Sequence, residues 1–321
     1  MTFNWAYVDQ TLVDLVDAKP CTPPDKFAKR YKSWNYSGAQ PFWSVYAHAR
    51  YSMTHATDTH SSVDDAEKLS SKDIFEVIRR DGEEELERPN ASLFWSGVAA
   101  GLMISLSVLG EAIFRTYLPD VKWAYLLENV GYSLGFLVVI LGRMQLFTEN
   151  TITTVLPVMQ DPTGAMFRRV ATLWSIVLFA NVIGAFLVAT AFAYGSFIPS
   201  ELLPAIDELS RHATGFAAGE AFQRAIPAGV LVAAIVWMLP QSEGFAFFLV
   251  LTFTWLIAAG DFTHIVAGSV EMAFLMVQGE LSLGRALGDF FIPVLAGNVL
   301  GGTVIFALLA FGQVRHELPD T

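Results

Sequence analysis

The sequence has little charge for its length. Of its 321 residues only 16% are Asp, Glu, Lys or Arg, whereas an average soluble domain has about 25%. The hydrophobic share is 53%, which excludes an intrinsically disordered chain. A soluble surface cannot be built with so few charges, and the composition therefore predicts an integral membrane protein.

Cysteine and basic residues are also scarce. Cys21 is the single cysteine, so the chain can form neither an intramolecular disulfide nor a thiolate metal site. The net charge is −11, and binding to phosphate backbones needs clustered Lys and Arg. We therefore expect no nucleic-acid partner, no metal and no cofactor.

The polar residues are concentrated at the start of the chain. Residues 1–90 contain 15 acidic and 11 basic side chains, and we interpret them as a soluble extension that is partly helical or disordered. Within it, 65–88 has the pattern of a helix with Ile74, Val77 and Ile78 as its apolar stripe.

Residues 91–315 are predicted to form a membrane domain. A helix needs about 20 apolar residues to span a bilayer, and six stretches are long enough. They are 93–117, 123–147, 168–195, 217–239, 245–277 and 289–312. Positive residues favour the cytoplasmic side of a membrane. Arg79, Arg80, Arg168 and Arg169 therefore predict an inner (plasma) membrane protein with both termini in the cytoplasm.

Two of the expected spans are interrupted by polar residues. One break follows Gln145, and the other runs from Gly260 to His264. Each contains a Phe-Thr pair, and Phe147 and Phe262 are 115 residues apart. Broken backbone is tolerated at membrane depth only where it lines a cavity or is buried in protein.

Further matches indicate an internal duplication. Asn181 and Asn298 each begin an Asn-apolar-apolar-Gly sequence, and they are 117 residues apart. Spans one and four share a Phe followed seven residues later by Gly101 or Gly229. We therefore expect an all-α protein made of two inverted three-helix repeats, with broken helices two and five and a transport site between them.

Three motifs resemble the formate/nitrite transporter family. They are Leu146-Phe147-Thr148, Gly260-Asp-Phe-Thr-His264 and Ile292-Pro-Val-Leu-Ala-Gly-Asn298-Val-Leu-Gly-Gly302. The resemblance covers about 92–312 and not the N-terminal extension. It implies an aquaporin-like six-span fold, a homopentamer with one pore per protomer, and passage of small monovalent anions.

The resemblance also implies roles for two polar residues. His264 would lie midway along the pore, where an imidazole can exchange a proton with a weak acid. Thr148 would donate a hydrogen bond to the anion or to His264. The alternatives are a structural histidine bonded to backbone at a helix break, and a threonine that caps the following short helix.

Several apolar side chains are expected around the pore. Phe136 and Ile257 fall at the family's two constriction positions, although core packing would explain either residue equally well. Leu146, Phe147 and Phe262 belong to the breaks themselves. Asn181 and Asn298 are expected to cap or cross-link helices rather than to touch the solute.

The chain also departs from the family at charged positions. Arg143 and Glu149 flank the first break, and we favour an ion pair between them over an Arg143 that attracts anions. Glu220 and Arg224 are four residues apart and can pair on one helix face. No partner for Glu271 can be identified from sequence, nor for two further acidic residues, Asp261 and Asp289. Thr263 stands where the family usually has Glu, which leaves the solute open.

The sequence therefore predicts a channel or transporter for a small monovalent anion, formate-like or nitrite-like, or for its neutral acid. We find no pattern typical of an enzyme. One alternative is a channel for a small neutral solute. Another is a membrane scaffold or sensor that acts through 1–90 and a cytoplasmic partner.

Overall fold

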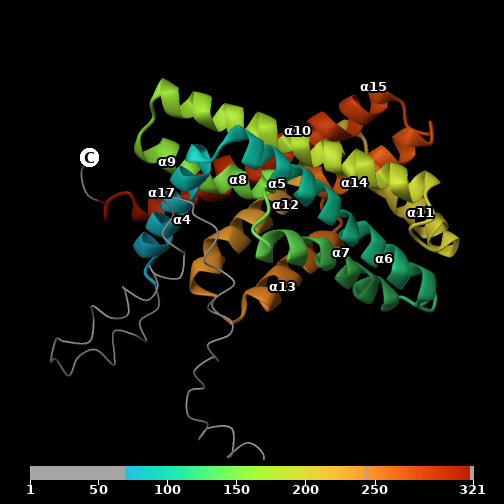
Figure 1. Ribbon diagram of the computed structural model, residues 1–321. Helices are drawn as coiled ribbons and strands as arrows, with labels where there is room; N and C mark the ends of the chain where they lie inside the picture. Colours follow the sequence, from blue (N-terminus) through green and yellow to red (C-terminus); the bar gives the residue numbers. More distant parts are fainter. Residues whose placement is uncertain (1–68, 243, 319–321) are drawn as a thin grey trace, which may run out of the picture. The chain divides into compact units, whose positions relative to one another are not determined.

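The computed structural model describes residues 69–242 and 244–318, and these residues form helices without strands. The predicted irregular segment 1–60 lies outside this range. Five helical runs in the described part are long and apolar enough to cross a bilayer (Figure 1). They are Asn90–Tyr117, Ala124–Leu141, Gly164–Tyr194, Ala218–Gln241 and Leu283–Val314.

The helix expected over 65–88 is α4, Ser71–Glu87. Ser70 and Asp73 form a reciprocal capping box that starts it. Its buried face pairs Ile74 and Ile78 with a buried Phe75, whereas Val77 is exposed, contrary to the predicted stripe. This face packs against α9, Val155–Gln160, and α17, Leu308–Val314. Helix α4 is therefore anchored on the membrane helices.

The first predicted repeat forms helices up to α10. Helix α5 and helix α6 make one long run, broken only at Ile104. The second predicted span ends early, because α7 stops at Leu141. The bounds are α5 Asn90–Met103, α6 Ser105–Tyr117, α7 Ala124–Leu141, α8 Phe147–Thr153 and α10 Gly164–Tyr194.

The second repeat follows a short amphipathic helix, α11, Leu203–Ala213. Its fifth predicted span, 245–277, consists of two helices of 14 and 13 residues, each too short to cross a bilayer alone. The last run includes two π-helical segments, η4 and η5. The bounds are α12 Ala218–Met238, α13 Ala246–Ala259, α14 Ile265–Val277, α15 Leu283–Arg285, η4 Ala286–Phe291, α16 Ile292–Val299 and η5 Leu300–Ala307. Two short 3-10 turns, η2 (Ser200–Leu202) and η3 (Leu239–Gln241), join helices.

Equivalent helices of the two repeats pack in equivalent ways. Helix α5 lies against α10, and α12 lies against α16. The helices that precede the two breaks, α7 and α13, pack on each other. Glycine allows the first two contacts. A Cβ at Gly101 would lie 2.1 Å from the Asn181 carbonyl oxygen, and one at Gly229 would lie 2.3 Å from that of Asn298. The predicted match between Gly101 and Gly229 therefore marks two equivalent backbone contacts.

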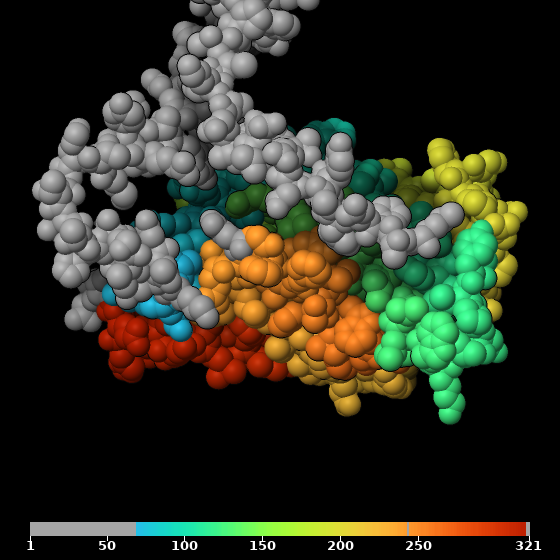
Figure 2. Space-filling view, turned by 90° about the horizontal axis from the view of Figure 1, so that it is seen from below, coloured from blue at the N-terminus to red at the C-terminus, as the bar shows by residue number. Residues whose placement is uncertain are grey.

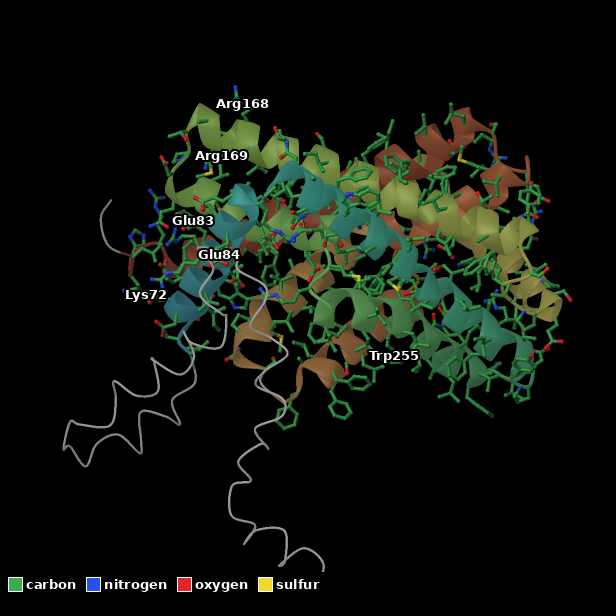
Figure 3. The ribbon with its side chains drawn as sticks, in the orientation of Figure 1. Lys72, Glu83, Glu84, Arg168, Arg169 and Trp255 are labelled. Carbon is green, nitrogen blue, oxygen red and sulfur yellow. The ribbon has the colours of Figure 1, made fainter. Side chains whose placement is uncertain are left out.

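The outer faces of the helices carry large apolar side chains. On α13, drawn in orange in Figure 2, Phe247 and Phe248 are 49% and 60% exposed, and Phe245 before the helix is 70% exposed. Charged side chains lie instead toward the ends of the bundle, and at one of these ends Figure 3 shows Lys72, Glu83, Glu84, Arg168 and Arg169. This distribution fits apolar faces within a bilayer and charges at its surface.

Candidate functional site at the two helix breaks

Helices α7 and α13 end in the same way. The residues after their C-terminal glycines, Arg143 and Asp261, have positive φ angles of 51° and 56°. After α7, the amides of Arg143 and Met144 bond to carbonyls three and five residues back, and the amides of Asp261 and Phe262 do so after α13. This is the Schellman geometry, which satisfies the last carbonyls of a helix and turns the chain.

The break after α7 is held by one asparagine of α10. The Asn181 Oδ1 accepts a hydrogen bond of 3.0 Å from the Phe147 amide. Its Nδ2 donates to the carbonyls of Gly97 and Gln145, each at 2.8 Å. Asn181 is fully buried, so the amide satisfies main-chain groups that cannot reach water.

The break after α13 is held by the matching asparagine of α16. The Asn298 Oδ1 accepts from the Ile265 amide at 2.8 Å. Its Nδ2 donates to the carbonyls of Ala225 at 2.8 Å and Thr263 at 3.1 Å. The two asparagines, here called the asparagine clamps, therefore each bind three main-chain groups, two in a break and one in a neighbouring helix.

The clamps correct the sequence alignment of the two breaks. Phe147 is equivalent to Ile265, because their amides occupy the same place in the two clamps. The predicted equivalence of Phe147 with Phe262 was wrong. A clamp binds a main-chain amide, which every non-proline residue has, and the side-chain match was therefore misleading.

His264 begins helix α14 and connects it to the other break. Its Nδ1 accepts a hydrogen bond of 3.3 Å from the Ala267 amide, which makes it the N-cap of α14. Its Nε2 lies 2.8 Å from the Thr148 Oγ1. Because Nδ1 is an acceptor, the proton of the neutral ring is on Nε2, and Nε2 donates to Thr148. The Thr148 hydroxyl proton is then available to a third group.

One apolar ring packs against this contact, and other buried apolar side chains are found at the two breaks. The Phe136 ring meets the His264 ring edge to face, with centroids 5.0 Å apart. Phe136, Ile257 and Leu146 are all fully buried. Phe147 instead packs on the ring of Trp174 of α10, 5.5 Å away, which places it beside the clamp rather than beside His264.

The expected ion pair between Arg143 and Glu149 was wrong. The Arg143 side chain is 83% exposed, and its ion-pair partner among the described residues is Asp81 of α4, at 3.9 Å. The left-handed backbone at Arg143 turns its side chain outward, whereas Glu149 lies in the first turn of α8. The predicted pair of Glu220 with Arg224 is confirmed at 2.9 Å.

His264 lies on the wall of a cavity of about 350 Å³ between α6, α7, α11 and α14. His264, Gly268 and Glu271 line it at positions 0, 4 and 7 of one helical face. Phe262 also lines it. The remaining lining residues are Glu111, Arg115, Tyr125, Glu128, Asn129, Tyr132, Glu208, Leu209, His212, Ala213, Phe216, Ala258, Asp261, Thr263 and Phe290.

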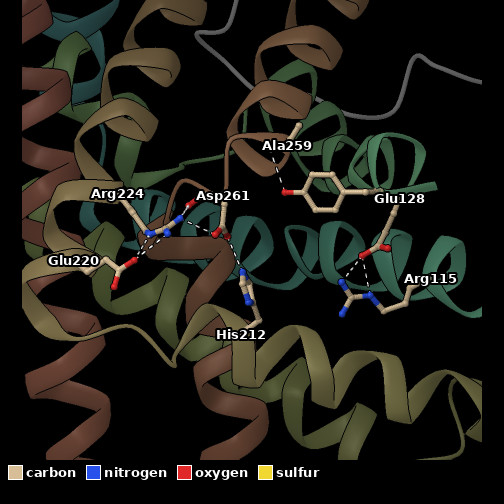
Figure 4. Close-up of polar contacts among 8 residues, drawn as sticks. Arg115, Glu128, His212, Glu220, Arg224, Ala259 and Asp261 are labelled. Carbon is tan, nitrogen blue, oxygen red and sulfur yellow. Dashed lines mark hydrogen bonds and ion pairs between the residues drawn. The ribbon is translucent and has the colours of Figure 1, made fainter. Parts of the chain in front are cut away.

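Ion pairs surround this cavity (Figure 4). Arg115 of α6 lies 2.6 Å from Glu128 of α7. Asp261, which had no predicted partner, binds Arg224 of α12 at 2.6 Å and His212 of α11 at 2.8 Å. Asp289 lies 3.5 Å from Arg285 on its own helix. The left-handed turn after α13 is therefore tied to two neighbouring helices.

Glu111, Tyr132 and His212 were missed by the sequence analysis. Glu111 had a signal, since an ionisable residue inside an apolar span faces an interior or an aqueous cavity. His212 lay outside the predicted spans, and no sequence signal pointed to it.

Comparison with known proteins places this architecture in a family. The family model described as formate/nitrite transporter matches residues 72–312. The chain belongs to the formate/nitrite transporter family. It is therefore a multi-pass membrane transport protein and not an enzyme.

Members of the formate/nitrite transporter family resemble the chain in sequence and in fold. It is 43% identical to the inner membrane protein YfdC of Escherichia coli over 258 residues, which covers 80% of this chain and 83% of the relative. A solved FNT family ion channel matches with a TM-score of 0.65 at 19% identity, over 77% of this chain and 99% of the other. A pentameric formate channel with formate bound matches with a TM-score of 0.58 at 19% identity, over 70% and 98%.

Proposed function

We propose that the protein conducts a small monovalent anion or its neutral acid past His264. The observation that carries this proposal is the contact between Thr148 and His264, which joins the two helix breaks beside a cavity. An anion that arrives there meets the Thr148 hydroxyl as a donor. The imidazole exchanges a proton with a weak acid, as its chemistry near neutral pH allows.

The apolar groups around the contact support selectivity. We propose that the buried side chains of Phe136, Ile257 and Leu146 act as constrictions that remove water from the solute. A hydrated metal cation would lose its water shell without replacement ligands there. A small anion or neutral acid would keep one hydrogen-bond partner at Thr148.

We further propose a homopentamer in the inner membrane, with one pore in each protomer and both termini in the cytoplasm. The pentameric formate channel of similar fold supports the assembly, and the relative YfdC supports the location. Native mass spectrometry would test the assembly. Cys21 offers a topology test, because an impermeant maleimide should label it only after the cytoplasmic face is opened.

The function is tested by flux into proteoliposomes. We expect uptake of at least one of formate, nitrite, acetate and hydrosulfide, and a change of at least about tenfold in His264→Asn, which retains a side chain that can cap α14. Flux no greater than in empty liposomes, or equal in the variant, would contradict the proposal. Flux that ignores membrane potential would favour the neutral-solute alternative.

The role of the N-terminal segment is a separate proposal. We propose that 1–60 is not needed for conduction. Deletion of 1–60 should leave the flux of the chosen solute unchanged. Loss of a co-purifying cytoplasmic protein upon this deletion, with flux intact, would support the scaffold role as an additional function.

A further inference from the structure

Two carboxyl groups in the cavity beside His264 have no hydrogen-bond or ion-pair partner in the part of the chain that the structure describes. Glu111 of α6 and Glu271 of α14 are only 6% and 7% exposed, and both line the cavity. The ion pairs found around the cavity among the described residues use other carboxylates, those of Glu128 and Asp261, although most buried polar groups are satisfied. Their remaining exposed surface is toward the cavity, which is where a binding partner would be.

The basic groups nearby are already engaged. Arg115 contacts Glu128 at 2.6 Å and Glu208 at 3.7 Å. His212 is bound to Asp261. When ionised, two further carboxylates without a counter-charge would make this part of the cavity strongly negative, and burial of uncompensated charge is costly. A bound cation would remove that cost.

The walls of the cavity indicate which kind of cation fits. Aromatic rings line it from α7, from η4, from the connection between α11 and α12, and from the break after α13: Tyr125, Tyr132, Phe290, Phe216 and Phe262. Ring faces attract organic cations, and carboxylates accept charge-assisted hydrogen bonds from an ammonium group. Among the described residues, no group of three or more His, Cys, Asp and Glu side chains is placed to hold a metal ion. A hard metal cation would also require more oxygen ligands than two carboxylates provide.

We propose that Glu111 and Glu271 form a binding site for a small ammonium-type cation in this cavity. The two carboxylates accept its N–H groups, and the aromatic walls contact its apolar side. The two glutamates are different residues from Thr148 and His264 of the proposed anion contact, and cation binding is measurable without any flux. When filled, it would neutralise the cavity through which an anion reaches His264.

The experiment is a calorimetric titration of the purified oligomer in nanodiscs with methylammonium chloride, at pH 7 and constant ionic strength. We expect saturable binding of one methylammonium per protomer, weakened at least about tenfold in E111Q and in E271Q. E84Q is the matched control, because Glu84 is exposed on α4, and it should bind as the wild type does. Sodium at the same concentration should not compete.

Several results would overturn this proposal. One is the absence of saturable binding by the folded wild-type oligomer, which is decisive even if a variant fails to fold. Another is an infrared band of protonated carboxyl groups that methylammonium does not change. If this band is absent from the double variant E111Q/E271Q, it belongs to Glu111 and Glu271, and these groups then hold protons rather than a cation. Methylammonium binding is measured without flux, and anion flux is measured without methylammonium, so a failed pore hypothesis and a failed cation site are distinguishable.

Discussion

The Nε2 atom of His264 and the Oγ1 atom of Thr148 lie 2.8 Å apart, although 116 residues separate them in the chain. The contact joins the first turn of α8 to the N-cap of α14. Each half of the protein thus contributes one polar group to the same buried point. Neither break could form this site by itself.

The Thr148 hydroxyl is expected to be needed for conduction. Thr148→Val removes the hydroxyl at nearly constant volume and leaves the His264 Nε2–H without its acceptor. Anion flux in proteoliposomes should fall by about tenfold or more, because hydrogen bonds to charged groups contribute about 1.5–3 kcal/mol. Thr148→Ser keeps the hydroxyl and should retain most of the flux. Equal flux in the two variants would show that the hydroxyl does not contact the solute.

The asparagine clamps are expected to stabilise the fold rather than to bind solute. Asn298→Ala leaves three buried main-chain groups without a partner, which should cost on the order of 3 kcal/mol or more. Asn181→Ala should have a similar effect. Asn129→Ala is the control, because Asn129 makes a single bond to the Tyr125 carbonyl within its own helix. Thermal unfolding of the purified oligomers should rank both clamp variants well below the control.

The two glycine contacts should not tolerate alanine. A Cβ at Gly101 or Gly229 would overlap a backbone carbonyl, and overpacking of this kind costs about 1–3 kcal/mol even where neighbours can move. Alanine at Gly288 has no atom within 4 Å of the added group and should be neutral. Lower expression and a lower Tm are expected for G101A and G229A. A normal Tm in both would refute the close approach of α5 to α10 and of α12 to α16.

Glu85 should make the stability of the protein depend on pH. Burial raises the pKa of its carboxyl above the ordinary value of 4.5, against the opposing effect of hydrogen bonds from Gln145 and Thr153. The folded protein then holds the proton more tightly than the unfolded chain, so stability is lost as the pH rises from about 4.5 through the raised pKa.

Glu85→Gln should remove this loss. The Tm of the variant relative to the wild type should therefore increase as the pH rises. The exposed neighbour offers a control, because E84Q should follow the wild type at every pH. A Tm difference between E85Q and the wild type that is constant with pH would show that Glu85 does not titrate in this way.

The sequence predicted the architecture because its signals are periodic and apolar. Long apolar runs, two interruptions and the paired Asn181 and Asn298 were sufficient to indicate two similar halves. The register of the breaks was not predictable, because the clamps bind the amides of Phe147 and Ile265, and an amide leaves no side-chain signature. Arg143 and Glu149 were misjudged for a related reason, since the left-handed backbone of Arg143 turns its side chain away from Glu149.

The cavity was predicted only in part. His264 was visible as a histidine in a break, but the other walls come from helices that are distant in sequence. Glu271 was recognised as a charge without a partner, and the structure brings it together with Glu111 in one cavity. The two glutamates line one cavity because of how α6, α11 and α14 pack together. The spacing of side chains along a single helix does not determine that packing.

The asparagine clamps have a consequence for how this architecture can change. Each clamp hydrogen-bonds only to main-chain amides and carbonyls. These groups are the same whatever side chains the breaks carry. Residues that line the cavity, such as Gly268, are therefore separable from the asparagines that keep the helices broken in place. One rigid frame can thus host pores of differing chemistry, and altered selectivity does not require a new fold.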